Sequence, residues 1–323
     1  MSLTFEEYTD LDDLRERLAD ADPEVRRVAT MGLAEVVEPE AADLAIAALK
    51  DSDAGVRAEA ARVLYEFEGN PDVIAALLEA LSDSDATVRE AAAETLAENK
   101  DGAMGALMLK RLDAEDPFVK ASVLRALREL RVPEAQGAAL ALLEHPDARV
   151  RREAVGVLAY LKASDVLMAL MSAARRDSDP EVRRAAMGSL VFSTSDRALE
   201  TLVDGLSDGH WQVREEAAFV IGKLAPPSAV EPLIGAMDDE YWQVRLKAAG
   251  SLGKLKNPVA IPALGAALAY EVSNLRKEAV GAMGEIASPD ALPFLEKALE
   301  DPDPDVRKVA RWSVGQIQAA AQS

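Results

Sequence analysis

The chain has 323 residues, contains no cysteine and carries a formal net charge of −21. The absence of cysteine excludes a disulfide framework and a thiolate metal site. So negative a charge disfavours nucleic acid as a partner, because phosphate contacts require clustered Lys and Arg side chains. No apolar run approaches membrane-spanning length, and the acidic start is unlike a signal peptide, so we expect a cytoplasmic protein that binds no membrane.

The first stretch of the chain, residues 5–19, predicts one amphipathic helix. Because no partner helix precedes it, we interpret residues 1–20 as an N-terminal cap on the array described below. Residues 1–100 hold 25 acidic and nine basic side chains, a net charge of −16 that leaves only −5 for the rest of the chain. This acidic arm is either a solvated surface or a docking surface for a basic partner. The apolar side of the first helix consists of Phe5, Tyr8, Leu11, Leu14 and Leu18.

A short motif then recurs through the chain, most plainly as Asp22-Pro23-Glu24-Val25-Arg26. A fixed period of 31 or 32 residues indicates an array of supersecondary units. Aspartate suits the N-cap and proline the first helical position, so each copy should begin a helix. The hydrophobic anchors of the copies are Val25, Val56, Val88, Val119, Val150, Val182, Val213, Val244, Leu275 and Val306.

A second apolar helix fits between successive copies, for example at residues 73–81 and 261–268. Each unit is therefore predicted to be a helix hairpin, and one hairpin alone buries too little apolar surface to be stable. We expect the hairpins to stack into a single domain over residues 1–323. After the cap, about nine hairpins occupy residues 21–300, and a final helix with a frayed end occupies residues 301–323.

The pattern D-x-x-V-R-x-x-A, seen at Asp179 to Ala186, resembles that of HEAT-repeat proteins. Within them it is most similar to the short-period group named after the phycobilisome lyases, and Ala229-Val230-Glu231-Pro232-Leu233 adds to the resemblance. The resemblance covers about residues 20–318. It implies an all-α fold, a right-handed α-solenoid of about ten hairpins. It also implies ladders between the aspartate and the following arginine of adjacent repeats, such as Asp22 and Arg26.

Copies seven to nine depart from the motif at three consecutive positions. The aspartate at three helix starts is lost, so Arg214, Arg245 and Arg276 are expected to lose part of their pairing, unless Asp208 and Asp239 substitute. Equivalent residues of consecutive repeats lie next to each other, so the changed positions should form small stripes. The N-cap column reads His210, Tyr241 and Val272, the next column Trp211, Trp242 and Ser273, and the third Gln212, Gln243 and Asn274.

Two interpretations of these stripes remain open. Trp211 and Trp242 either wedge between repeats as packing, or belong to a recognition patch in which aromatic rings supply contact area and arginines bind a partner's carboxylates. The partner-binding site predicted by the second interpretation consists of His210, Trp211, Gln212, Tyr241, Trp242, Gln243, Arg245, Tyr270, Asn274 and Arg276.

Catalytic chemistry finds little support in the sequence. The two histidines, His145 and His210, belong to no ligand set, and Gly250–Lys254 lacks the spacing of a phosphate-binding loop. We therefore expect no catalytic residue, metal or cofactor. The leading hypothesis is a non-enzymatic scaffold, monomeric in isolation, that binds a protein partner. The alternative is an assembly or bilin-lyase-like factor that holds an apoprotein or chromophore, with Arg245 and Arg276 binding propionate-like carboxylates.

Overall fold

The computed structural model describes residues 11–36, 38–161, 166–193 and 196–320. These residues form α-helices and short 3-10 segments, with no strand among them. The chain divides into two compact units, Met1–Leu161 and Lys162–Ser323. Phe5 and Tyr8, expected on the first helix, and the expected frayed end at residues 321–323 lie outside the described residues.

Unit 1 alternates between helices that begin at the repeated motif, here called motif helices, and helices that connect them. The motif helices are α2 (Pro23–Gly32), α4 (Ala54–Val63), α6 (Ala86–Glu98), α8 (Pro117–Leu130) and α10 (Ala148–Leu161). The connecting helices are α1 (Leu11–Leu18), α3 (Glu40–Ala48), α5 (Pro71–Ala80), α7 (Gly105–Lys110) and α9 (Ala135–Leu142).

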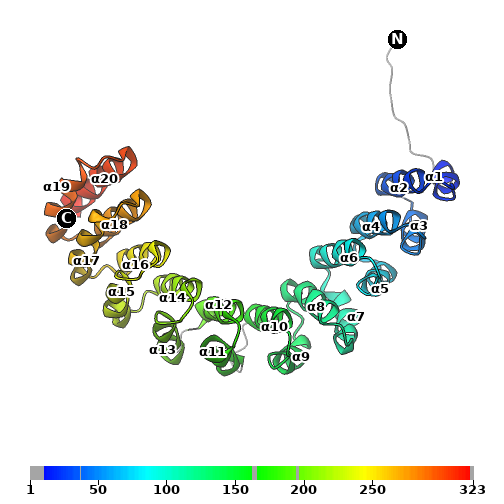
Figure 1. Ribbon diagram of the computed structural model, residues 1–323, viewed down its shortest axis with the longest axis horizontal. Helices are drawn as coiled ribbons and strands as arrows, with labels where there is room; N and C mark the ends of the chain where they lie inside the picture. Colours follow the sequence, from blue (N-terminus) through cyan, green and yellow to red (C-terminus); the bar gives the residue numbers. More distant parts are fainter. Residues whose placement is uncertain (1–10, 37, 162–165, 194–195, 321–323) are drawn as a thin grey trace, which may run out of the picture. The chain divides into compact units, whose positions relative to one another are not determined.

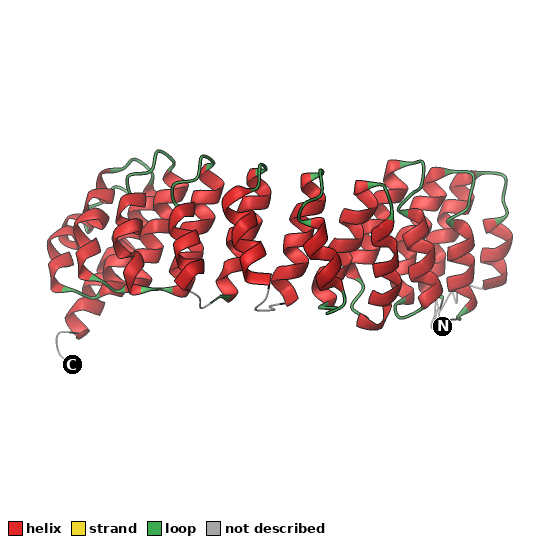
Figure 2. Ribbon diagram, turned by 90° about the horizontal axis from the view of Figure 1, so that it is seen from below, coloured by secondary structure: helices red, strands yellow, loops and turns green. Residues whose placement is uncertain are grey.

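Unit 2 repeats this alternation. Its motif helices are α12 (Pro180–Ser189), α14 (Trp211–Leu224), α16 (Trp242–Leu255), α18 (Ser273–Ile286) and α20 (Pro304–Ala320). Its connecting helices are α11 (Leu167–Arg176), α13 (Asp196–Gly205), α15 (Val230–Ala236), α17 (Ile261–Ala266) and α19 (Leu292–Ala298). Within each unit the motif helices lie side by side in one layer and the connecting helices in another (Figures 1 and 2). The predicted all-α solenoid class is confirmed.

Aspartate capping explains where most motif helices begin. Asp22, Asp53, Asp85, Asp116 and Asp179 each accept a backbone N–H from the first turn of the helix that follows. Three of these helices also carry proline at the first position, where no amide hydrogen is needed. The motif therefore sets the start of each helix, as the sequence predicted.

The core of each unit lies between its two layers. The anchor residues Val56, Val88 and Val119 in unit 1 and Val213 and Val244 in unit 2 are fully buried. Alanine and leucine fill most of the remaining interior, which permits close approach of neighbouring helices.

Helix α1 was expected to be a terminal cap that no partner helix precedes. It packs against α2 and also touches α3. In the same way, α3 packs against α4 and touches α5. Within the described residues, α1 thus takes the place of a connecting helix in a first hairpin.

Candidate protein-interaction site

Helices α14, α16 and α18 begin without a side-chain cap. Their N-cap residues are His210, Tyr241 and Val272, and none of these side chains bonds to the first turn. The backbone nevertheless keeps the extended cap conformation, and two aspartates hold it there. Asp208 accepts the amide of His210 at 2.8 Å, and Asp239 accepts the amide of Tyr241 at 2.9 Å. The cap positions of α14 and α16 can therefore carry other side chains without loss of the helix start.

A second set of aspartates pairs with the motif arginines across adjacent repeats. Arg214 Nε and Nη2 donate to Asp239 Oδ2 and Oδ1 at 2.6 and 2.9 Å, while Nη1 donates to the carbonyl oxygen of Asp208 at 2.8 Å. Each arginine meets an aspartate 25 or 26 residues further along the chain. We call this set the arginine ladder: Arg26–Asp51 and Arg57–Asp83 in unit 1, and Arg183–Asp208, Arg214–Asp239 and Arg276–Asp301 in unit 2.

The ladder corrects the pairing that the family resemblance implied. Arg26 pairs with Asp51 rather than with the cap aspartate Asp22. Asp51 lies two residues before the next cap residue, Asp53, and accepts its amide as well. The cap aspartates bond to their own helices, so the carboxylate that links two repeats comes from the turn before the motif.

Burial makes the ladder pairs of unit 2 strong. The side chains of Arg276 and Asp301 are only 11% and 8% exposed. The hydrogen bonds from Arg276 hold the pKa of Asp301 below its ordinary value. Charge-assisted bidentate pairs with so little solvent contact interact much more strongly than surface pairs.

Arg245 is the exception in unit 2. The residue 25 positions after it is Tyr270, whose ring centroid lies 4.1 Å from Arg245 Cζ. Arg245 Nη1 still donates to the carbonyl oxygen of Asp239 at 2.8 Å. Its Nε is buried and has no hydrogen-bond partner among the described residues. A tyrosine ring has thus taken the place of the ladder carboxylate.

The expected loss of arginine pairing is therefore right for Arg245, is prevented at Arg214 by a substitute that the sequence offered, and is wrong for Arg276. Arg214 pairs with Asp239, one of the two substitutes considered, and Arg276 pairs with Asp301. Arg276 belongs to the predicted site, but its Nε and Nη2 both donate to Asp301. These two nitrogens are therefore not available to bind a carboxylate of a partner.

Aromatic side chains link the starts of α14 and α16. The rings of Trp211 and Tyr241 are stacked, with centroids 5.5 Å apart and planes at 15°. Arg214 Cζ lies 5.6 Å from the centroid of the Tyr241 ring, so the stack is attached to the ladder. Tyr241 remains 38% exposed. Trp211 makes the contact that the packing interpretation expects, while Tyr241 is accessible to a partner.

The remaining predicted residues surround this stack. His210 and Asn274 are exposed, and Trp242 is half-buried. Gln212 and Gln243 each bury a side-chain carbonyl oxygen that has no hydrogen-bond partner among the described residues. The starts of α14, α16 and α18 thus combine exposed aromatic surface with polar atoms whose hydrogen-bonding capacity is unused.

Sequence reasoning named Asp239 as a substitute partner but missed the ladder as a repeated feature, including Asp301. The recurring spacing of 25 or 26 residues after the motif arginine was visible in the sequence. It also missed Phe219 on α14, which is 37% exposed and lies between Lys223 Nζ at 5.2 Å and Lys247 Nζ at 5.6 Å. No sequence signal distinguishes Phe219, because its exposure depends on how the helices pack.

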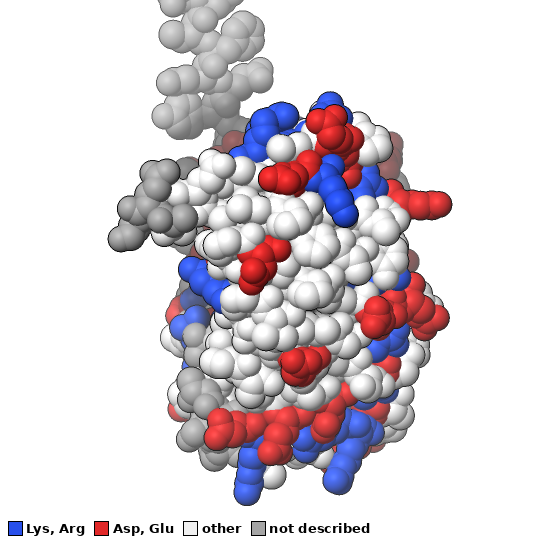
Figure 3. All heavy atoms as spheres, turned by 90° about the vertical axis from the view of Figure 1, so that its left-hand side faces the viewer, with Lys and Arg blue, Asp and Glu red and all other residues white. Residues whose placement is uncertain are grey.

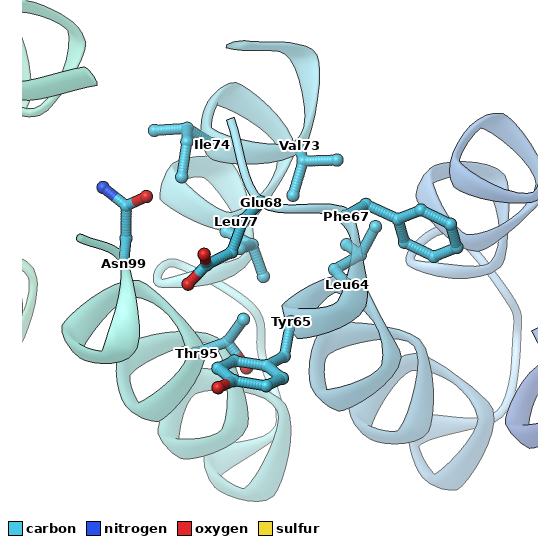
Figure 4. A pocket seen from close by; sticks show the side chains of 9 residues that line it. All are labelled: Leu64, Tyr65, Phe67, Glu68, Val73, Ile74, Leu77, Thr95 and Asn99. Atoms are coloured by element: carbon cyan, nitrogen blue, oxygen red, sulfur yellow. The ribbon is translucent and has the colours of Figure 1, made fainter. Parts of the chain in front are cut away.

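A small cavity in unit 1 lies among the 3-10 segment η2 (Leu64–Phe67), α5 and α6 (Figure 4). Val73, Ile74 and Leu77 form its apolar wall, and Thr95 and Asn99 add polar atoms. Its volume of about 10 Å³ has room for roughly one water molecule, so it is no substrate site.

The described part of the chain offers neither a metal-ligand cluster nor a membrane-spanning helix. No three His, Asp or Glu side chains there are grouped so that they could hold a metal ion. No described helix is both long enough and apolar enough to cross a lipid bilayer.

Comparison with protein families matches the chain to the sequence model of HEAT repeats. The matched segments are residues 11–97, 74–145, 105–190, 136–210, 199–274 and 271–323. Comparison with curated protein sequences gives no significant match.

Solved structures with the same fold include Kap95p, the karyopherin Kap121p and an engineered protein. Kap95p, from a structure with RanGDP, superposes with a TM-score of 0.67 at 14% identity, covering 95% of this chain and 49% of Kap95p. The karyopherin Kap121p, bound to the extreme C-terminus of the phosphatase Cdc14p, gives a TM-score of 0.55 at 16% identity, covering 95% of this chain and 41% of its own. An engineered protein superposes with a TM-score of 0.50 at 22% identity, covering 95% of this chain and 98% of the engineered protein. The chain thus spans about half the length of Kap95p and less than half the length of Kap121p. Sequence identities this low establish the fold alone.

Proposed function

Because the chain belongs to the HEAT-repeat family, we propose that it is a non-enzymatic scaffold that binds a protein partner through the starts of α14, α16 and α18. The observation that carries the proposal is the replacement of a ladder aspartate by Tyr270 beside Arg245. We call the proposed binding surface the aromatic patch, defined as His210, Trp211, Gln212, Tyr241, Trp242, Gln243, Arg245, Tyr270 and Asn274.

The chemistry of the aromatic patch suits a protein segment with aromatic and acidic side chains. Exposed Tyr241 offers a large rigid contact area, and such residues dominate the energetics of many interfaces. Among the described residues Arg245 has no carboxylate within ion-pair distance, unlike Arg214, which pairs with Asp239. Its Nε is buried, so a partner carboxylate would bind the rest of the guanidinium. Kap95p and Kap121p, which share the fold, were solved with protein partners. This architecture is therefore compatible with protein recognition.

The acidic arm at residues 1–100 is a second contact surface in this proposal. Its net charge of −16 would attract a basic partner or a basic region of the same partner. A cytoplasmic location and a monomeric state in isolation stay predictions from the sequence.

The bilin-lyase-like alternative is weaker than the scaffold function. It requires Arg245 and Arg276 to bind carboxylates, and Arg276 is engaged with Asp301. Membership of the phycobilisome-lyase group likewise stays a prediction. An absorbance band in the visible range that shifts when the protein is mixed with a tetrapyrrole would favour this alternative.

A matched pair of tyrosine variants tests the proposed site. Tyr241→Ser removes exposed ring area from the aromatic patch, and Tyr65→Ser removes a comparably exposed ring from unit 1. We expect affinity purification with quantitative mass spectrometry to show a partner that Tyr241→Ser loses and Tyr65→Ser keeps. A partner retained equally by both variants would contradict the proposal.

Trp242→Ala separates recognition from packing at the half-buried ring. Loss of the partner at an unchanged melting temperature would support recognition. A large fall in melting temperature with unchanged binding would assign Trp242 to packing.

A further inference from the structure

A groove lies in unit 2 at the opposite ends of the motif helices from the aromatic patch. Helices α14, α16 and α18 have 14 residues each and are followed by residues in the left-handed conformation, Ala225, Lys256 and Ala287. Helix α20 has 17 residues, Pro304–Ala320. Ala319 and Ala320 of its last turn line the groove together with Ala287, which follows α18. Figure 2 shows the helix next to the C-terminal end running beyond its neighbours.

The groove is large enough for a peptide side chain and its neighbours. It measures about 620 Å³, within the range of roughly 300–1,000 Å³ typical of ligand sites. Its lining includes Trp312 and Gln316 of α20, Gly284 and Glu285 of α18, and Lys254 of α16. Trp312 is 52% exposed, and tryptophan with so much free surface is typical of interaction sites rather than of packing.

Two lysines give the groove its charge. Lys254 and Lys256 are exposed, and neither forms an ion pair with a described residue. Glu285 is the one acidic side chain among the residues that line the groove, and it does not come within ion-pair distance of either lysine in the described structure. With Glu285 as the one acidic lining residue, the two lysines give the lining a net positive charge. They complement a negatively charged ligand.

The surface beside the groove is suited to an apolar contact. Figure 3 shows the end of unit 2 that carries α19 and α20, where side chains without charge cover most of the middle and a few acidic side chains lie among them. Most lysine and arginine side chains gather along its margins.

We propose that this groove, here called the α20 groove, binds an acidic peptide segment with an aromatic anchor residue. The aromatic side chain packs against Trp312, and flanking carboxylates pair with Lys254 and Lys256. The proposal is independent of the aromatic patch, because that patch lies at the N-terminal ends of α14, α16 and α18, whereas the groove lies at the C-terminal ends of α16, α18 and α20.

The test uses the full chain and a fluorescein-labelled probe peptide, Asp-Glu-Phe-Glu-Asp, with binding followed by fluorescence anisotropy. We expect saturable binding that weakens when the phenylalanine of the probe is replaced by glycine, and that is absent when its acidic residues are replaced by lysine. In the protein, Trp312→Ala and the double change Lys254→Glu/Lys256→Glu should each weaken binding by roughly tenfold.

Matched controls locate the effect. Lys308→Glu changes an exposed lysine at the other end of α20, and should bind the probe within about twofold of the unchanged protein. Tyr241→Ser should bind the probe normally, so failure of the aromatic patch and failure of the groove give different results. Absence of saturable binding, or equal affinity in Trp312→Ala, the lysine double variant and Lys308→Glu, would overturn the proposal. The melting temperature of each variant, measured by thermal unfolding, checks that the substitution leaves the fold intact.

Discussion

The guanidinium of Arg245 stacks on the ring of Tyr270 at the place where Arg214 meets Asp239 one repeat earlier. The two arrangements use the same arginine column, the same spacing of 25 residues and the same contact from Nη1 to a backbone carbonyl. They differ in that Tyr270 leaves Arg245 Nε buried without an acceptor. A buried donor without a partner costs stability, so Tyr270 is a position where the repeat has departed from its most stable form.

Tyr270→Asp should restore the ladder and stabilise the protein. A carboxylate there can accept from Nε and Nη2 of Arg245, which offsets the lost cation–π contact of about 0.5–1 kcal/mol. We expect the free energy of unfolding to rise by about 1 kcal/mol in chemical denaturation at neutral pH. Tyr270→Asn is the control, because it has nearly the same shape without the charge and should gain less. A Tyr270→Asp variant that unfolds more readily than the unchanged protein would contradict this account of Arg245.

Asp239→Asn should be among the most damaging single changes in unit 2. The side chains of Arg214 and Asp239 are 10% and 8% exposed, and loss of the Asp239 carboxylate leaves the buried guanidinium with only the exposed Glu240, at 3.6 Å, as a counter-charge. We expect unfolding free energy to fall by about 2–4 kcal/mol, measured by denaturant titration. Glu24→Gln in unit 1 is the control, since Glu24 is 71% exposed and its pair with Arg27 should leave the melting temperature unchanged. Similar effects of the two changes would show that burial does not govern these pairs.

Local chemistry explains what the sequence could predict. The cap aspartate, the proline and the helical spacing act within one turn, so the start of a helix such as α2 or α12 follows from a few consecutive residues. The partner of Arg26 did not follow, because Asp51 lies 25 residues away and reaches it only through the packing of two hairpins.

The two proposed sites likewise differ in whether local sequence or helix packing determines them. The changed residues at His210, Trp211 and Tyr241 stood out because they break a repeated motif. The α20 groove could not be predicted, because it depends on where α20 stops and on which side of Trp312 is left uncovered. A periodic sequence predicts the elements and marks departures from the period, whereas surfaces formed by neighbouring helices require the structure.

Glu216→Gln should stabilise the protein at neutral pH. Burial raises the pKa of Glu216 above its ordinary value, and nearby Arg184 offsets this only in part. A folded-state pKa above the unfolded one means that protonation favours the fold, so this contribution is complete below about pH 4.5 and is lost as the pH rises through the folded pKa. Glutamine keeps the neutral form at every pH. We expect its melting temperature to exceed that of the unchanged protein by about 1–3 °C at pH 7, with the difference vanishing near pH 4.

Glu296→Gln provides the comparison for this pH effect, because Glu296 is exposed on α19. It should change the melting temperature little at either pH. A Glu216→Gln variant whose advantage persists undiminished at pH 4 would show that the gain comes from packing rather than from removal of the charge.

Two glycines at equivalent positions should respond to alanine with opposite signs. Gly222 of α14 lies so close to Ser251 of α16 that a Cβ would overlap the serine hydroxyl, which donates to the carbonyl oxygen of Ala218 at 2.7 Å. Gly222→Ala must separate the two helices or break that bond, so unfolding free energy should fall by about 1–3 kcal/mol. Gly315 of α20 would place its Cβ in open space, and Gly315→Ala should raise stability by about 0.5–1 kcal/mol through helix propensity. Denaturant titration of both variants measures this directly, and a shift in the same direction for both would show that the close approach of α14 and α16 does not set the identity of Gly222.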